Sequence, residues 1–254
     1  MAKLRAASTM FFLALLGMIF PGCNGDGEAE KYEDGFYEGD TFYFYQGGTG
    51  KGEMKAGQRE GKWVFFHPDE WKSAEGGFRT GREEGPWTFF FANGKVNREG
   101  AYRAGKQHGH WKAYFDDGTL ESEGDYKNGR RTGIWQYFHF NTQRRSLGSF
   151  DDDVRIGQWE FWYNNGQKQE VRAYRDGENV LRHSWKENGE PMVVEGTGPY
   201  EYWEFGQLKE KGAYRDGKME GEWTFWDGGQ VVNTQVYTAG EVVGDSIPDG
   251  PAEP

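Results

Sequence analysis

The sequence predicts an all-β fold, an elongated single-layer antiparallel sheet in which tandem β-hairpins follow one another as a meander. Three observations predict it: a motif that recurs at a fixed interval, turn dipeptides that recur between the motifs, and a composition that combines abundant glycine with many aromatic side chains. The segments between the turns are roughly 7–10 residues long, which suits strands and is too short for typical helices.

The repeated motif is Gly-x-Trp followed by an aromatic pair. A fixed period of this kind indicates stacked copies of one supersecondary unit. Worn or shortened copies near residues 39–52, 185–194, 198–200 and 221–223 extend the array to about eight hairpins, or roughly sixteen strands, and about 75 Å of sheet. The regular copies are evenly spaced along the chain and begin at Gly61, Gly85, Gly109, Gly133 and Gly157.

Two series of turn dipeptides divide each period. Asn-Gly and Asp-Gly tolerate positive φ at both central residues, as a two-residue hairpin turn requires. Both series are therefore predicted to be two-residue turns. The first comprises Thr80-Gly81, Ala104-Gly105, Asn128-Gly129, Asp152-Asp153, Asp176-Gly177 and Asp216-Gly217. The second comprises Asn93-Gly94, Asp117-Gly118, Asn165-Gly166, Asn188-Gly189 and Asp227-Gly228.

Composition and charge restrict the class of protein. Leu, Ile, Val and Phe make up under a fifth of the chain, a level typical of disorder, but 11 Trp, 14 Tyr and 19 Phe are too many for a disordered chain. The net charge is −11, and no basic cluster offsets it. Since such a surface repels phosphates, nucleic acid is not an expected partner.

The segment 1–23 has the pattern of an export signal. Lys3 and Arg5 precede a short apolar run, 9–20, that is too short to span a bilayer comfortably. The run ends at Cys23, which resembles the lipobox cysteine of bacterial lipoproteins and is the expected lipidation site. Phe20 and Pro21 depart from the lipobox pattern, and the alternative is a secretory signal cut elsewhere. Because Cys23 is the only cysteine, an intramolecular disulfide is excluded.

These patterns divide the chain into four segments: a signal peptide at 1–23, an acidic flexible tether at 24–35, the repeat array at 36–243, and an acidic, proline-containing disordered tail at 244–254. The expected location is the cell envelope, with the membrane reached through the lipid anchor alone.

Side-chain alternation assigns the repeated aromatic residues to two faces of the sheet. One row is predicted to pack as the structural core: Trp63, Trp87, Trp111, Trp135, Trp159 and Trp223. A second row falls on the opposite, mainly polar face and is the candidate binding face: Phe66, Phe90, Tyr114, Phe138, Trp162 and Trp226. The alternative is that the second row only supports itself across the sheet.

The repeat unit resembles that of the bacterial MORN-repeat variants, Gly-x-Trp-x-x-Tyr, Asn-Gly, Gly-x-Tyr, Asn-Gly, over about residues 36–240. The resemblance implies hairpins stacked into a twisted single-layer sheet. It also implies non-catalytic roles, namely scaffolding and protein contacts. Some relatives are described as membrane proteins or as antitoxins.

Catalytic and cofactor motifs are not recognised. The stretch 100–106 is one residue short of a phosphate-binding loop, and the same letters recur at 212–218 as a product of the repeat. His108 and His110 could face one side of a strand, but a solvated pair is the preferred interpretation over a metal site. Asp151, Asp152 and Asp153 lack the ligand spacing of a calcium loop. No enzyme activity, cofactor or metal is therefore expected.

The leading functional hypothesis is a non-catalytic scaffold or binding module of the cell envelope, because repeat folds offer extended surfaces to a protein or polymer. The alternatives are a carbohydrate- or choline-type ligand-binding surface protein and an antitoxin-like partner protein. The identity of the partner does not follow from the sequence.

Overall fold

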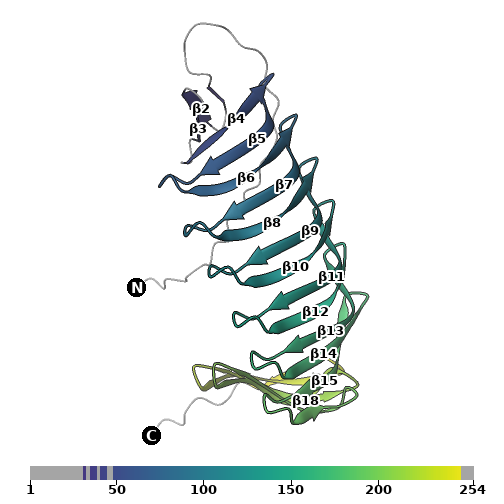
Figure 1. Ribbon diagram of the computed structural model, residues 1–254. Helices are drawn as coiled ribbons and strands as arrows, with labels where there is room; N and C mark the ends of the chain where they lie inside the picture. Colours follow the sequence, from purple (N-terminus) through teal and green to yellow (C-terminus); the bar gives the residue numbers. More distant parts are fainter. Residues whose placement is uncertain (1–30, 33–34, 39–40, 45–47, 247–254) are drawn as a thin grey trace.

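The computed structural model describes residues 31–32, 35–38, 41–44 and 48–246. These residues form 21 strands and no helix, so no helix in the described part of the chain could cross a membrane. Every strand pairs antiparallel with the next one along the chain within its sheet, which confirms the predicted meander of consecutive hairpins (Figure 1).

The first sheet contains sixteen strands in sequence order. Its strands are β1 (Lys31–Tyr32), β2 (Gly35–Glu38), β3 (Thr41–Phe44), β4 (Thr49–Lys55), β5 (Gln58–Phe66), β6 (Lys72–Arg79), β7 (Arg82–Phe90), β8 (Val96–Arg103), β9 (Lys106–Tyr114), β10 (Leu120–Lys127), β11 (Arg130–Phe138), β12 (Arg144–Asp151), β13 (Val154–Trp162), β14 (Lys168–Arg175), β15 (Glu178–Trp185) and β16 (Pro191–Val193).

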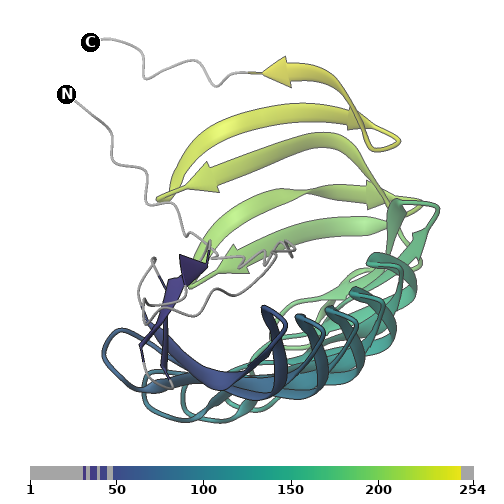
Figure 2. The same ribbon diagram turned by 90° about the horizontal axis from the view of Figure 1, so that it is seen from above.

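The second sheet contains five strands and lies across the end of the first (Figures 1 and 2). Its strands are β17 (Gly198–Glu204), β18 (Gln207–Arg215), β19 (Lys218–Asp227), β20 (Gln230–Thr238) and β21 (Glu241–Ser246). The structure has more strands than the roughly sixteen that were predicted. The additional strands include the short β1 and β2, which precede the first copy recognised in the sequence, near residues 39–52.

Two predicted segment boundaries differ from the structure. Lys31–Tyr32 pairs with β2, so the end of the predicted tether is part of the sheet. At the other end, β21 continues to Ser246 and takes in the first residues of the predicted tail.

The tryptophan row is buried although each sheet is a single layer. The six predicted tryptophans are only 0–5% exposed. Each indole lies flat on a glycine of the preceding strand, where an added Cβ would overlap the ring. Each indole Nε1 also donates a hydrogen bond of 3.0–3.2 Å to the carbonyl oxygen of the residue ten positions earlier. The glycines under the rings are Gly52, Gly76, Gly100, Gly124, Gly148 and Gly212.

The glycine of the Gly-x-Trp motif has a different role. Opposite Gly76 and Gly77 of β6 lie Trp87 and Glu84 of β7, so Gly85 and Pro86 form a bulge. The φ of Gly85 is +77°, and nothing lies within 4 Å of the position of its Cβ. This glycine is therefore required for backbone conformation, while the glycine on the neighbouring strand makes room for the ring.

We call the sheet face that carries the buried tryptophans the tryptophan face. On this face the aromatic rings of neighbouring hairpins form one continuous cluster. Tyr102 meets Trp87 and Trp111 edge to face, with centroid distances of 5.7 and 5.2 Å. The same contacts recur from Trp63 to Tyr174 along the first sheet. Because aromatic pairs favour this geometry, each repeat stabilises the next.

Arginine side chains cover parts of this aromatic face. The guanidinium carbon of Arg131 lies 4.1 Å from the Phe150 ring centroid, and that of Arg155 lies 4.5 Å from the Trp159 centroid. The long side chains shield the rings while their charge interacts with the π faces. A single-layer sheet can thus bury its rings without a second layer.

The two series of turns differ, which corrects the sequence prediction. In the first series both central residues have positive φ, for example 49° at Ala104 and 81° at Gly105. In the second series only the glycine does at most positions: Gly94 has φ +79°. Here the N–H of Gly94 donates to the Phe91 carbonyl and that of Phe91 to the Lys95 carbonyl, a longer loop with the glycine in its last position.

The predicted meander is divided into two sheets, and the break follows a repeat that lacks the tryptophan–glycine contact. Arg172 occupies the position of the glycine under the ring, and Leu181 lies opposite it instead of tryptophan. Arg172 donates to Glu170 at 2.6 Å, and the Tyr200 hydroxyl of β17 donates to the same carboxylate at 2.5 Å. Burial together with this carboxylate raises the pKa of Tyr200. The second sheet therefore packs where the tryptophan–glycine contact is missing.

Neighbouring hairpins are also linked at the sheet edges. In the first turn series Gly105 N–H donates to the Glu83 carbonyl, and Gly129 N–H donates to the Gln107 carbonyl. In the second series the Asn93 side chain donates to the Asp116 carbonyl of the next turn. The contacts of each repeat are therefore chiefly with its immediate neighbours, as in other solenoid-like arrays.

Removing one complete period should leave a folded protein. Deletion of 85–108 removes one 24-residue unit and rejoins equivalent positions at Gly109. The variant should keep its β circular dichroism spectrum and a cooperative thermal transition. Deletion of half that length removes one strand, reverses the chain direction and should abolish the transition. Equal behaviour of the two deletions would contradict the hairpin as the repeating unit.

Candidate functional site: the polar face of the sheet

The candidate site lies on the sheet face opposite the tryptophan face, which we call the polar face. Lys62 and Glu75 form an ion pair of 3.2 Å across β5 and β6, and Lys168 and Glu160 form one of 2.9 Å across β13 and β14. The hydrogen bonds from these lysines lower the pKa of Glu75 and of Glu160. The polar face therefore carries ionised carboxylates beside lysines.

All six residues of the predicted ring row are half-buried in the structure. Two of these rings contact cations of the polar face. The Lys72 Nζ lies 4.1 Å from the Phe90 centroid, and the Arg144 guanidinium carbon lies 5.4 Å from the Trp162 centroid. At these two rings a cation of the protein covers part of the surface that a ligand would use.

The middle of the row has a different environment. Val96 and Leu120 lie one and two repeat periods after Lys72. They hold, relative to Tyr114 and Phe138, the position that Lys72 holds relative to Phe90, so an aliphatic side chain replaces the cation there. Leu120 pairs directly with Tyr114. Tyr114 thus pairs with an apolar side chain, whereas Phe138 pairs with Arg144 of the next strand.

Tyr114 is fixed by a hydrogen bond within the polar face. Its hydroxyl donates to Glu99 Oε1 at 2.7 Å. Partial burial, followed by this carboxylate, raises the pKa of Tyr114 to about 12. The phenol therefore stays protonated at neutral pH and holds both its own ring and Glu99 in place.

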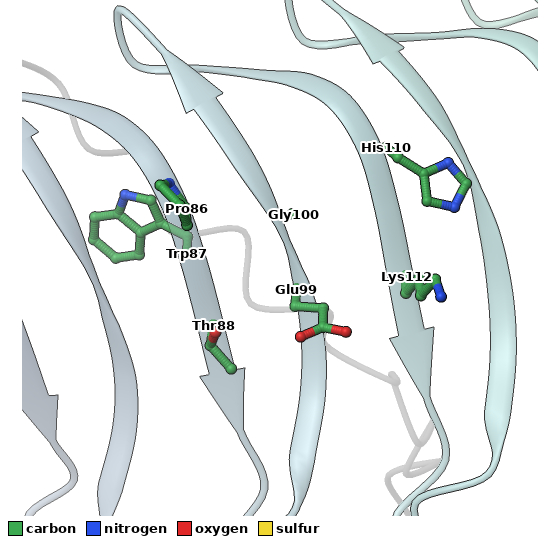
Figure 3. A pocket seen from close by; sticks show the side chains of 7 residues that line it. All are labelled: Pro86, Trp87, Thr88, Glu99, Gly100, His110 and Lys112. Carbon is green, nitrogen blue, oxygen red and sulfur yellow. The ribbon is translucent and has the colours of Figure 1, made fainter.

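A shallow pocket lies between β7, β8 and β9 (Figure 3), and its lining residue Glu99 is the hydrogen-bond partner of Tyr114. Its volume is about 290 Å³. Glu99 and Lys112 extend from neighbouring strands at one end, while His110 lies farther along β9 (Figure 3). The lining residues are Pro86, Trp87, Thr88, Glu99, Gly100, His110 and Lys112.

The two histidines of β9 are placed on the polar face but differ in their contacts. The ring nitrogens of His110 lie 3.0 Å from Asp125 and 3.3 Å from Glu123, so His110 is bound to the neighbouring strand rather than merely solvated. Glu123 also accepts a hydrogen bond from Gln136 at 2.6 Å. The Nδ1 of His108 is buried and has no hydrogen-bond partner among the described residues.

Two other sequence features were considered as sites. Asp152 and Asp153 form a hairpin turn with φ of 49° and 71°, and Asp153 accepts a hydrogen bond of 2.9 Å from the Arg131 side chain. Cys23 lies outside the described residues. Within the described part of the chain no three acidic, histidine or cysteine side chains are grouped so that they could hold a metal ion.

The structure also exposes apolar residues that sequence analysis did not select. Phe205, at a turn of the second sheet, is 99% exposed and has φ +49°. Ile134 and Ile156 are exposed on the polar face, on either side of Ser149. Their departure from the repeat pattern, in which polar residues prevail at these positions, is the signal that could have found them.

Comparison with known proteins identifies two consecutive units. Residues 83–104 and 107–128 match the MORN repeat variant model. The first match spans most of the hairpin β7–β8 and the second most of β9–β10, the strands that carry the pocket. No curated protein matches the chain. MORN repeats are generally repeat modules that bind other molecules, and this chain contains two of them in tandem.

Proposed function

We propose that this protein is a non-catalytic binding module that uses the polar face of its long sheet as a contact surface for a polymer or an extended chain. The observation that carries the proposal is the row of one ring per hairpin on a face of charged and hydrogen-bonding side chains. Since two strands separate successive rings, the rings lie about 10 Å apart. Several weak contacts at this interval can add up to a stable complex.

The setting that we propose is the bacterial cell envelope. The apolar run that ends at the only cysteine supports export and attachment through Cys23. The net charge of −11 supports a partner other than nucleic acid. A carbohydrate polymer is one form of this proposal. A choline-type ligand and an antitoxin-like role are the alternatives to it, and export disfavours a cytoplasmic toxin as partner.

Replacing Cys23 by alanine is expected to move the protein from the membrane fraction to the soluble fraction. Alanine has no thiol and therefore cannot carry the lipid. In this proposal no other anchor holds the protein at the membrane once the signal peptide has been cleaved. Fractionation followed by immunoblotting measures the shift. Equal membrane retention of the variant and the natural protein would remove the anchor from the account.

Replacing Tyr114, Phe138 and Trp162 together by serine is expected to abolish binding to envelope material. All three side chains are half-buried on the polar face, so the tryptophan face and the fold should survive. Co-sedimentation with an envelope fraction measures binding, and circular dichroism verifies the fold. Undiminished binding by a folded triple variant would place the contact surface elsewhere.

A further inference from the structure

We infer that the ligand of the polar face is a neutral, β-1,4-linked polysaccharide that runs across the strands with one disaccharide for each hairpin. This inference rests on the proposed function and names its ligand class. It follows from two properties of the surface: the interval between its rings, and the kind of hydrogen-bonding groups beside them.

The spacing of about 10 Å between successive rings excludes one class of ligand and is compatible with two others. A peptide in extended conformation presents same-side side chains every 7 Å or so, which does not match a ring row with a step of about 10 Å. A polyproline II peptide repeats every 9 Å or so, in three residues, and is admitted by length. A β-1,4-linked disaccharide is also admitted, because it has nearly the length of the two-strand step of about 10 Å.

Hydrogen-bonding chemistry separates these two. The polar face presents carboxylates at one per hairpin, at Glu75, Glu99 and Glu123. A proline-rich backbone offers carbonyl acceptors and few donors, so carboxylates cannot bind it. Sugar hydroxyls both donate and accept, and they can therefore bond to the carboxylates as well as to Lys112 or Gln136.

The pocket supplies the position at which a sugar ring would be held most firmly. Its volume of about 290 Å³ gives room for one pyranose ring. Glu99 and Lys112 at one end offer an acceptor and a donor, and Thr88 offers a hydroxyl (Figure 3). Because Tyr114 is bonded to Glu99, the stacking ring and the carboxylate that lines the pocket are oriented together.

Charge restricts the polysaccharide further. The lysines of the polar face are paired with carboxylates, Lys62 with Glu75 and Lys168 with Glu160, so these cations are already neutralised, and the whole chain carries −11. An acidic polysaccharide would be repelled by this field. The expected ligand is therefore uncharged.

Calorimetric titration of the full chain with oligosaccharides of increasing length tests the inference. The probes are cello- and chito-oligosaccharides of two, four and six units, with maltohexaose as a control of the same composition as cellohexaose but with α-linkages. For the β-1,4-linked series affinity should rise by roughly 10²-fold from the dimer to the hexamer, because each added disaccharide reaches another ring. Maltohexaose, which coils, should bind at least tenfold more weakly.

Two variants assign the binding to this surface. Tyr114→Ser with Phe138→Ser should remove the gain between dimer and hexamer, while Phe205→Ser, which alters an exposed ring outside the row, should leave it unchanged.

The possible failures are distinguishable. If the protein binds envelope material through Tyr114 and Phe138 but no β-1,4-linked oligosaccharide, the ligand class is wrong and the proposed function stands. If a proline-rich peptide bound and the hexasaccharides did not, the ligand would be a polyproline II peptide and not a polysaccharide. Hexasaccharide binding that survives loss of both rings would overturn the assignment to this face.

Discussion

Replacing Trp159 by alanine is expected to lower the free energy of unfolding by about 3–5 kcal/mol. Trp159 is fully buried, lies edge to face against Phe150 at 5.0 Å and is covered by Arg155. Its Nε1 donates to the Ser149 carbonyl at 3.1 Å. The substitution therefore removes a large apolar surface and leaves a partly buried carbonyl without its donor. Urea titration followed by circular dichroism measures the loss.

Trp162 provides the matched control for this substitution. It lies three residues further along the same strand, on the polar face, and is half-buried. Trp162→Ala should cost about 1 kcal/mol, in the range of ordinary single substitutions. If Trp162→Ala proved as costly as Trp159→Ala, the assignment of the core to the tryptophan face would be wrong.

Replacing Gly148 by alanine is expected to cost about 3 kcal/mol or more. A Cβ at this position would overlap the indole of Trp159, and the ring has little freedom to move because it is packed on both sides. Gly157→Ala is the contrasting variant. Nothing lies within 4 Å of its Cβ position, so only its φ of +65° opposes a side chain. That strain should cost about 1 kcal/mol.

A double-mutant cycle separates steric overlap from other effects of Gly148→Ala. When Trp159 is already alanine, the added Cβ meets no ring, so Gly148→Ala should then be nearly neutral. The resulting coupling energy should be about 3 kcal/mol, at the upper end for residues in contact. A coupling energy near zero would show that the glycine is required for backbone freedom rather than for the ring.

The repeated part of the fold could be predicted from the sequence because each regular copy has the same pattern of tryptophan and turn residues. A tryptophan at the same place in every regular copy, with turn dipeptides between, is compatible with a hairpin array and with little else. The division into two faces also followed, because side-chain alternation needs only the strand and not its neighbours.

The features that were missed depend on pairing between strands. Which glycine lies under an indole is decided by register, and Gly148 precedes its ring by eleven residues. The packing of the second sheet against β14 also could not be read from the sequence, because Arg172 looks like an ordinary substitution until it is known that Glu170 accepts hydrogen bonds from both Arg172 and Tyr200. The second turn series was misassigned because Asn-Gly suits both a two-residue turn and a longer loop.

Only part of the candidate site could be predicted from the sequence. The ring row could be counted from the period, but the cations on Phe90 and Trp162 come from a different strand or the preceding repeat. The pocket between β7, β8 and β9 requires residues from three strands. Neither could be derived without the register of the sheet.

The central claim is that one face of the sheet is the core and the other is a contact surface. Hydroxyl-radical footprinting of the free protein, read by mass spectrometry, tests it most directly. Trp159 and Trp135 should oxidise at rates set by unfolding, while Tyr114 and Trp162 should react several times faster in the native state. Equal reactivity of the two rows, or faster oxidation of the tryptophan row, would contradict the assignment of the faces and with it the proposed binding surface.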